Sequence, residues 1–157
     1  MSRNKQKGFS LIELLIVVAI ILIIAAIAIP NLLRSKMAAN EASAVVSLRT
    51  LNTSVVAYST TYNTDPSNLV SLGPATTASS TAADLVDSLL GTDPATKSGY
   101  TITYAAVGSA PITQYTMIAK PVSSSTGQRL FFTDQSGVIR QTTDGSTPSA
   151  SSTPIGG

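Results

Sequence analysis

The residues with the clearest chemistry stand near the N-terminus, where a basic stretch meets a long apolar run. The junction reads Gly8-Phe9-Ser10-Leu11-Ile12-Glu13. Glu13 places a carboxylate inside a segment that otherwise suits lipid, and ionisable groups in such segments mark functional sites by default. Hydrolysis of the uncluttered Gly8–Phe9 bond would create an α-amine four residues before this carboxylate. A cut at this bond, followed by pairing of the new amine with the carboxylate, is one chemistry that these residues could support.

The apolar run itself has three interpretations. From Phe9 to Ile29 only Ser10 and Glu13 are polar, and at ~1.5 Å per residue a helix of this length crosses a hydrocarbon core. The run could be an ordinary single-pass anchor. It could be a secretory signal cut after Ala28, although Pro30 would then be the second mature residue. It could also be an N-terminal helix that loses a basic leader at the Gly8–Phe9 bond.

The segment after Pro30 favours the third interpretation, because it continues as a helix. Apolar residues recur there at helical spacing, namely Met37, Ala44, Leu48, Leu51, Val55, Tyr58 and Tyr62, while Arg34, Glu41, Arg49 and Asn52 are assigned mainly to other faces. One helix is predicted from about Ser10 to Asn63. Pro30 lacks an amide donor and is expected to kink or loosen it. An anchor with a helical stalk stays an alternative.

These residues together resemble the N-terminus of a type IV pilin or a type II secretion pseudopilin precursor. The resemblance covers about Lys7 to Lys36 and includes Pro30, the helix-loosening proline. It implies that a prepilin peptidase removes residues 1–8 by cutting between Gly8 and Phe9, and that the same enzyme, a methyltransferase, methylates the amine of Phe9. It also implies that Glu13 guides filament assembly.

The partner of the Glu13 carboxylate stays open in the sequence. After cleavage the Phe9 ammonium would lie at the positive end of the helix dipole, where a nearby carboxylate is favoured. Glu13 could pair with Phe9 of a neighbouring subunit and set the axial register between subunits. It could pair within its own chain, because the two residues are one helical turn apart. It could also simply cap the first turn behind Ser10.

The remaining residues predict an α+β protein, in which a helix packs on a small antiparallel sheet. The predicted parts are the membrane-spanning or filament-core helix 9–30, its amphipathic half 31–63, a globular head 64–142 and a mobile Ser/Thr/Pro/Gly tail 143–157. Within the head we expect short helices over 65–73, with Asp65 as N-cap, and 81–90, a turn over 92–99, and strands over 100–104, 114–120, 129–133 and 138–141.

Composition excludes several functional classes. The chain has no cysteine and no histidine, so disulfides, thiolate sites and histidine-based catalysis are excluded. The aspartates lie in turns, and Asp134 and Asp144 lack the ordered spacing of a calcium loop. We therefore expect no catalytic residue, cofactor or metal. The net charge of +2 comes from the basic leader, so it indicates no nucleic-acid partner.

The resemblance implies a structural subunit of a type IV pilus-like filament that polymerises through its N-terminal helix. The precursor would span the inner membrane once, in contact with lipid, with its head outside the cytoplasm, and the assembled form would be a surface filament. The implied partners are further copies of the chain, the peptidase, the inner-membrane assembly platform and its ATPase motor. The alternatives are a type II secretion pseudopilin and a membrane-anchored binding protein.

Overall fold

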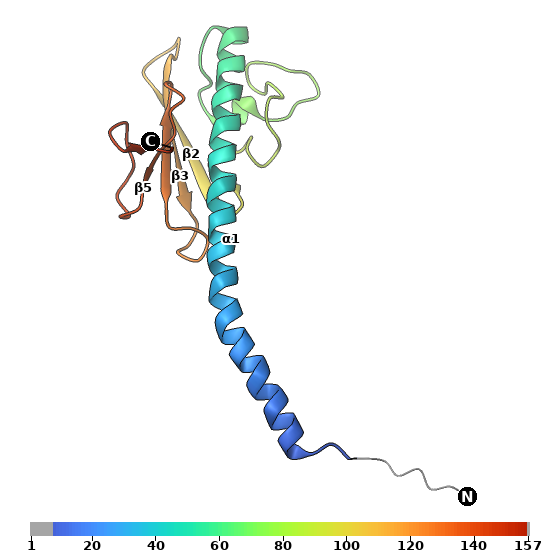
Figure 1. The fold of residues 1–157 in the computed structure, drawn as a ribbon. Helices are drawn as coiled ribbons and strands as arrows, with labels where there is room; N and C mark the ends of the chain where they lie inside the picture. Colours follow the sequence, from blue (N-terminus) through green and yellow to red (C-terminus); the bar gives the residue numbers. More distant parts are fainter. Residues whose placement is uncertain (1–7, 157) are drawn as a thin grey trace, which may run out of the picture. The chain divides into compact units, whose positions relative to one another are not determined.

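A computed structural model of the chain describes residues 8–156 (Figure 1). The order of elements is α1 (Leu11–Tyr62), the 3-10 helix η1 (Leu69–Leu72), β1 (Ala95–Lys97), β2 (Tyr100–Val107), β3 (Gln114–Pro121), β4 (Leu130–Asp134), β5 (Arg140–Thr142) and β6 (Thr153–Pro154). The chain divides into two compact units, with the boundary between Ser35 and Lys36. The predicted leader, residues 1–8, lies outside the described residues except for Gly8.

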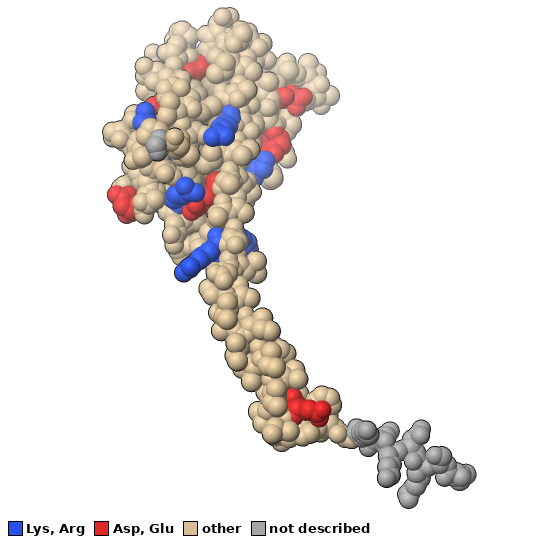
Figure 2. All heavy atoms as spheres, in the orientation of Figure 1, with Lys and Arg blue, Asp and Glu red and all other residues tan. Residues whose placement is uncertain are grey.

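The first unit contains the N-terminal part of α1. Its aliphatic side chains are exposed on all sides of the helix, and the helix runs without a break through Pro30. No Asp, Glu, Lys or Arg stands between Glu13 and Arg34 in the sequence, and Figure 2 shows this uncharged stretch. Within the described residues, α1 is long and apolar enough to cross a membrane. The predicted helix limits are confirmed to within one residue, whereas a kink at Pro30 stays a prediction.

The second unit contains one antiparallel sheet, in which each strand pairs with its neighbours in the sequence (Figure 1). The longest pairing joins β2 to β3 along eight residues each. The predicted hairpin of β4 and β5 is confirmed, with Phe131 opposite Gln141. Such an order needs only short connections, because antiparallel strands can follow one another through tight turns.

The core lies between this sheet and the second half of α1. The predicted helical stripe is confirmed, since Leu48 and Leu51 are 0% exposed. Side chains from the strands meet the stripe, namely Tyr100, Ile102, Tyr104, Tyr115, Met117, Ala119 and Phe131. The fold class is therefore α+β, as predicted. Burial of each large side chain contributes about 1.5–3 kcal/mol, so this contact is the main source of stability in the unit.

Of the two helices predicted in the head, the first is shorter than predicted and has a different cap, and the second is wrong. The helix expected over 65–73 is the 3-10 helix η1, capped by Asn68, whose side-chain oxygen accepts from the Ser71 amide at 3.1 Å, while Asp65 is not the cap. Residues 81–90 form no helix, because the amides of their middle part donate to the carbonyls of residues 71–73 instead. Three core residues there, Ala83, Val86 and Leu90, have spacings that imitate a helical stripe.

The sheet has two more strands than the sequence predicts. Strand β1 lies in a segment predicted as a turn, and it pairs with β2. Strand β6 lies in the segment predicted as a mobile tail and pairs with β5, and Pro148 in the same segment is fully buried. Strands of two or three residues carry no readable alternation, so their partners determine them. The mobility of the tail as a whole stays a prediction.

Candidate functional site

The bond predicted to be cut lies just before helix α1, which begins at Leu11. Gly8 is exposed and the Phe9 side chain is 78% exposed. A Cβ added at Gly8 would meet no atom of the described residues within 4 Å. Packing of this segment therefore does not require glycine. A requirement for a small residue here would come from another protein that approaches the bond.

Glu13 caps the first turn of α1. Its Oε2 accepts a hydrogen bond from the backbone amide of Ser10 at 3.2 Å, while the carbonyl of Ser10 accepts from the Leu14 amide at 3.3 Å. This is one half of a capping box, in which a glutamate three residues after the N-cap satisfies the N-cap amide. The carboxylate also lies at the positive end of the helix dipole. Of the three partners considered for Glu13, the structure shows the capping contact.

The predicted site residues lie in two separate parts of the chain. Gly8, Phe9 and Glu13 belong to one short segment at the start of α1. Pro30 follows Glu13 by seventeen residues, which corresponds to about 25 Å along an ideal helix. Pro30 therefore cannot take part in chemistry at the cleavage bond. Its effect on the chain is restricted to the helix backbone, where it removes one amide donor.

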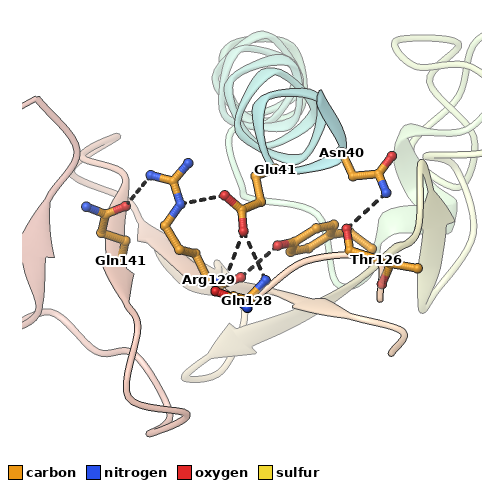
Figure 3. Close-up of polar contacts among 7 residues, drawn as sticks. Asn40, Glu41, Thr126, Gln128, Arg129 and Gln141 are labelled. Atoms are coloured by element: carbon orange, nitrogen blue, oxygen red, sulfur yellow. Dashed lines mark hydrogen bonds and ion pairs between the residues drawn. The ribbon is translucent and has the colours of Figure 1, made fainter. Parts of the chain in front are cut away.

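A polar cluster centred on Glu41, which the sequence pattern did not predict, lies in the second unit (Figure 3). Glu41 is 8% exposed, so its assignment to a face away from the stripe is wrong. Its Oε1 accepts from the backbone amides of Gln128 at 2.9 Å and Arg129 at 3.2 Å, and its Oε2 accepts from Nε of Arg129 at 2.7 Å. The sequence does contain a signal for the burial of Glu41. Ala44 and Leu48 of the buried stripe follow it by three and seven residues, a spacing that places all three on one face of the helix.

The electrostatics of this cluster favour the ionised carboxylate. Burial raises the pKa of the Glu41 carboxyl, but the hydrogen bonds from Gln128 and Arg129 together with the Arg129 charge lower it by more, so the pKa lies below its ordinary value. Arg129 is held in turn by Gln141, whose Oε1 accepts from Nη1 at 2.9 Å. The guanidinium also lies over the Phe131 ring, 5.6 Å from its centroid.

Two comparisons with known proteins found similarity, one to a family model and one to a single protein. Residues 3–29 match a family model described as the prokaryotic N-terminal methylation motif. Over 38 residues, or 24% of this chain, the sequence is 60% identical to the type IV wide pilus major component PilA4 of Thermus thermophilus, and the match spans 29% of that protein's length. The chain therefore carries a prokaryotic N-terminal methylation motif and is related to a type IV pilin.

Proposed function

We propose that this protein is a structural subunit, without enzymatic activity, of a type IV pilus-like filament. The observation that carries the proposal is a methylation motif over residues 3–29 that includes the start of a helix exposing aliphatic side chains on every side. A helix of that kind needs an apolar environment all round. Lipid supplies it for the single-pass precursor in the inner membrane, and the helices of other copies supply it in the filament.

Maturation begins with hydrolysis of the amide between Gly8 and Phe9 by the prepilin peptidase. Water adds across the bond, which leaves a carboxylate on Gly8 and an α-amine on Phe9, the atom that is then methylated. An α-amine has a pKa of about 7.7–8.0 and is largely protonated at neutral pH. It lies at the positive end of the helix dipole, an unfavourable place for a cation. The Glu13 carboxylate provides the compensating charge.

Assembly then depends on this charge pair more than on apolar contacts. Lipid tails are as apolar as the aliphatic side chains of α1, so transfer from the bilayer to the filament core gains little free energy from burial. A charge at the bilayer centre costs about 2.5–3.5 kcal/mol on insertion scales, and less near the interface. Pairing Glu13 with a Phe9 amine of a neighbouring subunit relieves the cost that remains for both charges. The small net gain is why extrusion needs an assembly platform and an ATPase motor.

The test combines the mass of the purified subunit with electron microscopy of cells. We expect a mature chain that begins at a methylated Phe9 and surface filaments that disappear when this gene product is removed. A mature N-terminus at Met1 would support an uncleaved anchored protein, and one at Ile29 would support a secretory signal. Either result would overturn the proposal.

A type II secretion pseudopilin is the second candidate, because the resemblance at residues 7–36 covers both kinds of subunit. The two are separated by what is lost with the protein. Loss of secreted enzymes from cells that carry no surface filament supports the pseudopilin, whereas loss of filaments with normal secretion supports the pilus subunit.

A further inference from the structure

Two polar side chains of α1 lie beside its buried apolar stripe and contact opposite ends of strand β4. They are Glu41 and Asn52, which are eleven residues apart in the sequence. Eleven residues make about three full turns of an α-helix, so the two side chains lie on nearly the same face and about 16 Å apart along the axis. The apolar residues Leu48 and Leu51 stand between them.

Glu41 holds the residues that lead into β4. Its carboxylate accepts from the backbone amides of Gln128 and Arg129 and from the Arg129 side chain (Figure 3). The same connection is held from β2, because the Tyr100 hydroxyl donates to the Arg129 carbonyl at 2.8 Å. A Cβ at Gly127 would collide with that hydroxyl, so glycine is needed for this close approach.

Asn52 holds the residues at the other end of β4. Its Nδ2 donates to Oγ1 of Thr133 at 2.9 Å and, more weakly, to the Gly137 carbonyl at 3.5 Å. Its Oδ1 accepts from the Tyr115 hydroxyl at 3.1 Å, which ties β3 to the same point. Thr133 is 0% exposed. A buried hydroxyl needs a hydrogen-bond partner, and Asn52 provides one.

The spacing of the two contacts along the β4 segment matches the spacing of Glu41 and Asn52 along α1. Arg129 and Thr133 are four residues apart, which is about 14 Å along an extended strand, close to the separation of Glu41 and Asn52 along the helix. Apolar contacts alone would not select this alignment, because they are non-directional and the helical stripe repeats every three or four residues. Hydrogen bonds are directional, so a slip of one helical turn would break those at both ends.

We propose that Glu41 and Asn52 are positioning residues that set the axial register of β4, and with it the whole sheet, on helix α1. The chain has no cysteine, so no disulfide can perform this task. The inference concerns the second unit by itself and holds whether or not the protein builds filaments.

The test measures register directly in the full-length chain in detergent. Because the chain has no cysteine of its own, nitroxide labels can be placed at two introduced ones, Thr53→Cys on α1 and Ala105→Cys on β2, both exposed positions. Pulsed electron paramagnetic resonance should give one narrow distance distribution. The pair Glu41→Met and Asn52→Leu, which replaces both polar groups with apolar ones of similar size, should broaden it or add a second distance.

The matched control removes an ion pair that does not join the sheet to α1. Lys97 and Asp87 are 2.8 Å apart and substantially exposed, and the pair Lys97→Met and Asp87→Leu should leave the distribution narrow. A folded Glu41→Met/Asn52→Leu variant with the parent's narrow distribution would overturn the proposal.

Single variants decide the question if the double variant does not fold. Glu41→Met removes the acceptor for the Gln128 and Arg129 amides and should speed their hydrogen exchange about tenfold, the effect of one lost hydrogen bond at each amide, while the Thr133 amide stays protected. Asn52→Leu should instead speed exchange of the Thr133 amide and leave the Gln128 and Arg129 amides protected. Equal loosening of both ends in either variant, or of neither end, would contradict separate positioning roles.

Discussion

If the leader is removed as proposed, Glu13 meets different charges before and after the cut. In the described chain its carboxylate accepts from the Ser10 amide, a contact that a neutral side chain can also make. Cleavage would add an ammonium on Phe9, and a neutral side chain cannot compensate that charge. Capping and charge pairing can therefore be separated by chemistry, because only the second needs a negative charge.

Glu13→Gln keeps the acceptor for the Ser10 amide and removes the charge, whereas Glu13→Ala removes both. We expect both variants to be cut and methylated at Phe9, since the peptidase acts on the bond before the helix, and both to form few or no filaments. Electron microscopy and mass spectrometry check this. Normal filaments from Glu13→Gln and few from Glu13→Ala would show that capping alone matters.

Gly8 offers a second prediction for a single residue. Because a Cβ at Gly8 meets no described atom within 4 Å, Gly8→Val should leave the unfolding temperature of the head unchanged. We expect it to block leader removal, because a branched side chain obstructs access to the bond. Mass spectrometry of the membrane fraction would show the uncut precursor. Normal cleavage of this variant would contradict a role for Gly8 in processing.

At the scale of elements, strand β4 and helix α1 are joined by polar contacts as well as by the apolar stripe. The Glu41 cluster makes one of these contacts dependent on pH. The folded pKa of Glu41 is lowered, so the contact stabilises the fold fully above the unfolded pKa, about 4.3 for glutamate. That stabilisation is lost as the pH falls through the folded pKa.

The unfolding free energy in urea should therefore fall more steeply below about pH 4.3 in the parent than in Glu41→Gln, which has no carboxyl to titrate. Asp144→Asn is the control for the loss of a carboxyl with a lowered pKa: its hydrogen bonds come from Ser146, two residues away and fully exposed, so they contribute little to stability and its pH curve should follow that of the parent. Parallel pH curves for the parent and Glu41→Gln would show that the cluster contributes nothing to acid sensitivity.

For the molecule as a whole, the methylation motif and the core that stabilises the head belong to different units. The methylation motif and the exposed apolar helix lie before residue 36, and the core that stabilises the head lies after it. A change in the core should therefore alter the stability of the head without altering the cut at Phe9.

Leu51→Ala tests this separation. Leu51 is fully buried, so the substitution should cost about 2–5 kcal/mol, while Val56→Ala on the exposed side of the same helix should cost little. Urea unfolding in detergent measures the first effect, and the mass of the mature N-terminus should be the same in all three proteins. Failure of Leu51→Ala to be processed while Val56→Ala is processed normally would show that the units are coupled.

Local patterns in the sequence were enough to identify the N-terminal motif and to predict the helix Leu11–Tyr62 and the strands β2 to β5. Each rests on a period or a spacing that holds within one segment, such as the alternation of Tyr100, Ile102 and Tyr104. A long apolar run followed by an apolar stripe has few structures other than a helix available to it. The α+β class follows from the same patterns, because both kinds of element have one face to bury.

Only the tertiary structure decided the places of Glu41 and Asn52, the strands β1 and β6, and the non-helical path of residues 81–90. A charge at the edge of a helical stripe is exposed or buried according to whether a partner such as Arg129 meets it. The amides of Ala83 and Leu85 join no helix because carbonyls at Ser71 and Leu72 accept from them. These outcomes depend on residues distant in the chain, so no local pattern contains them.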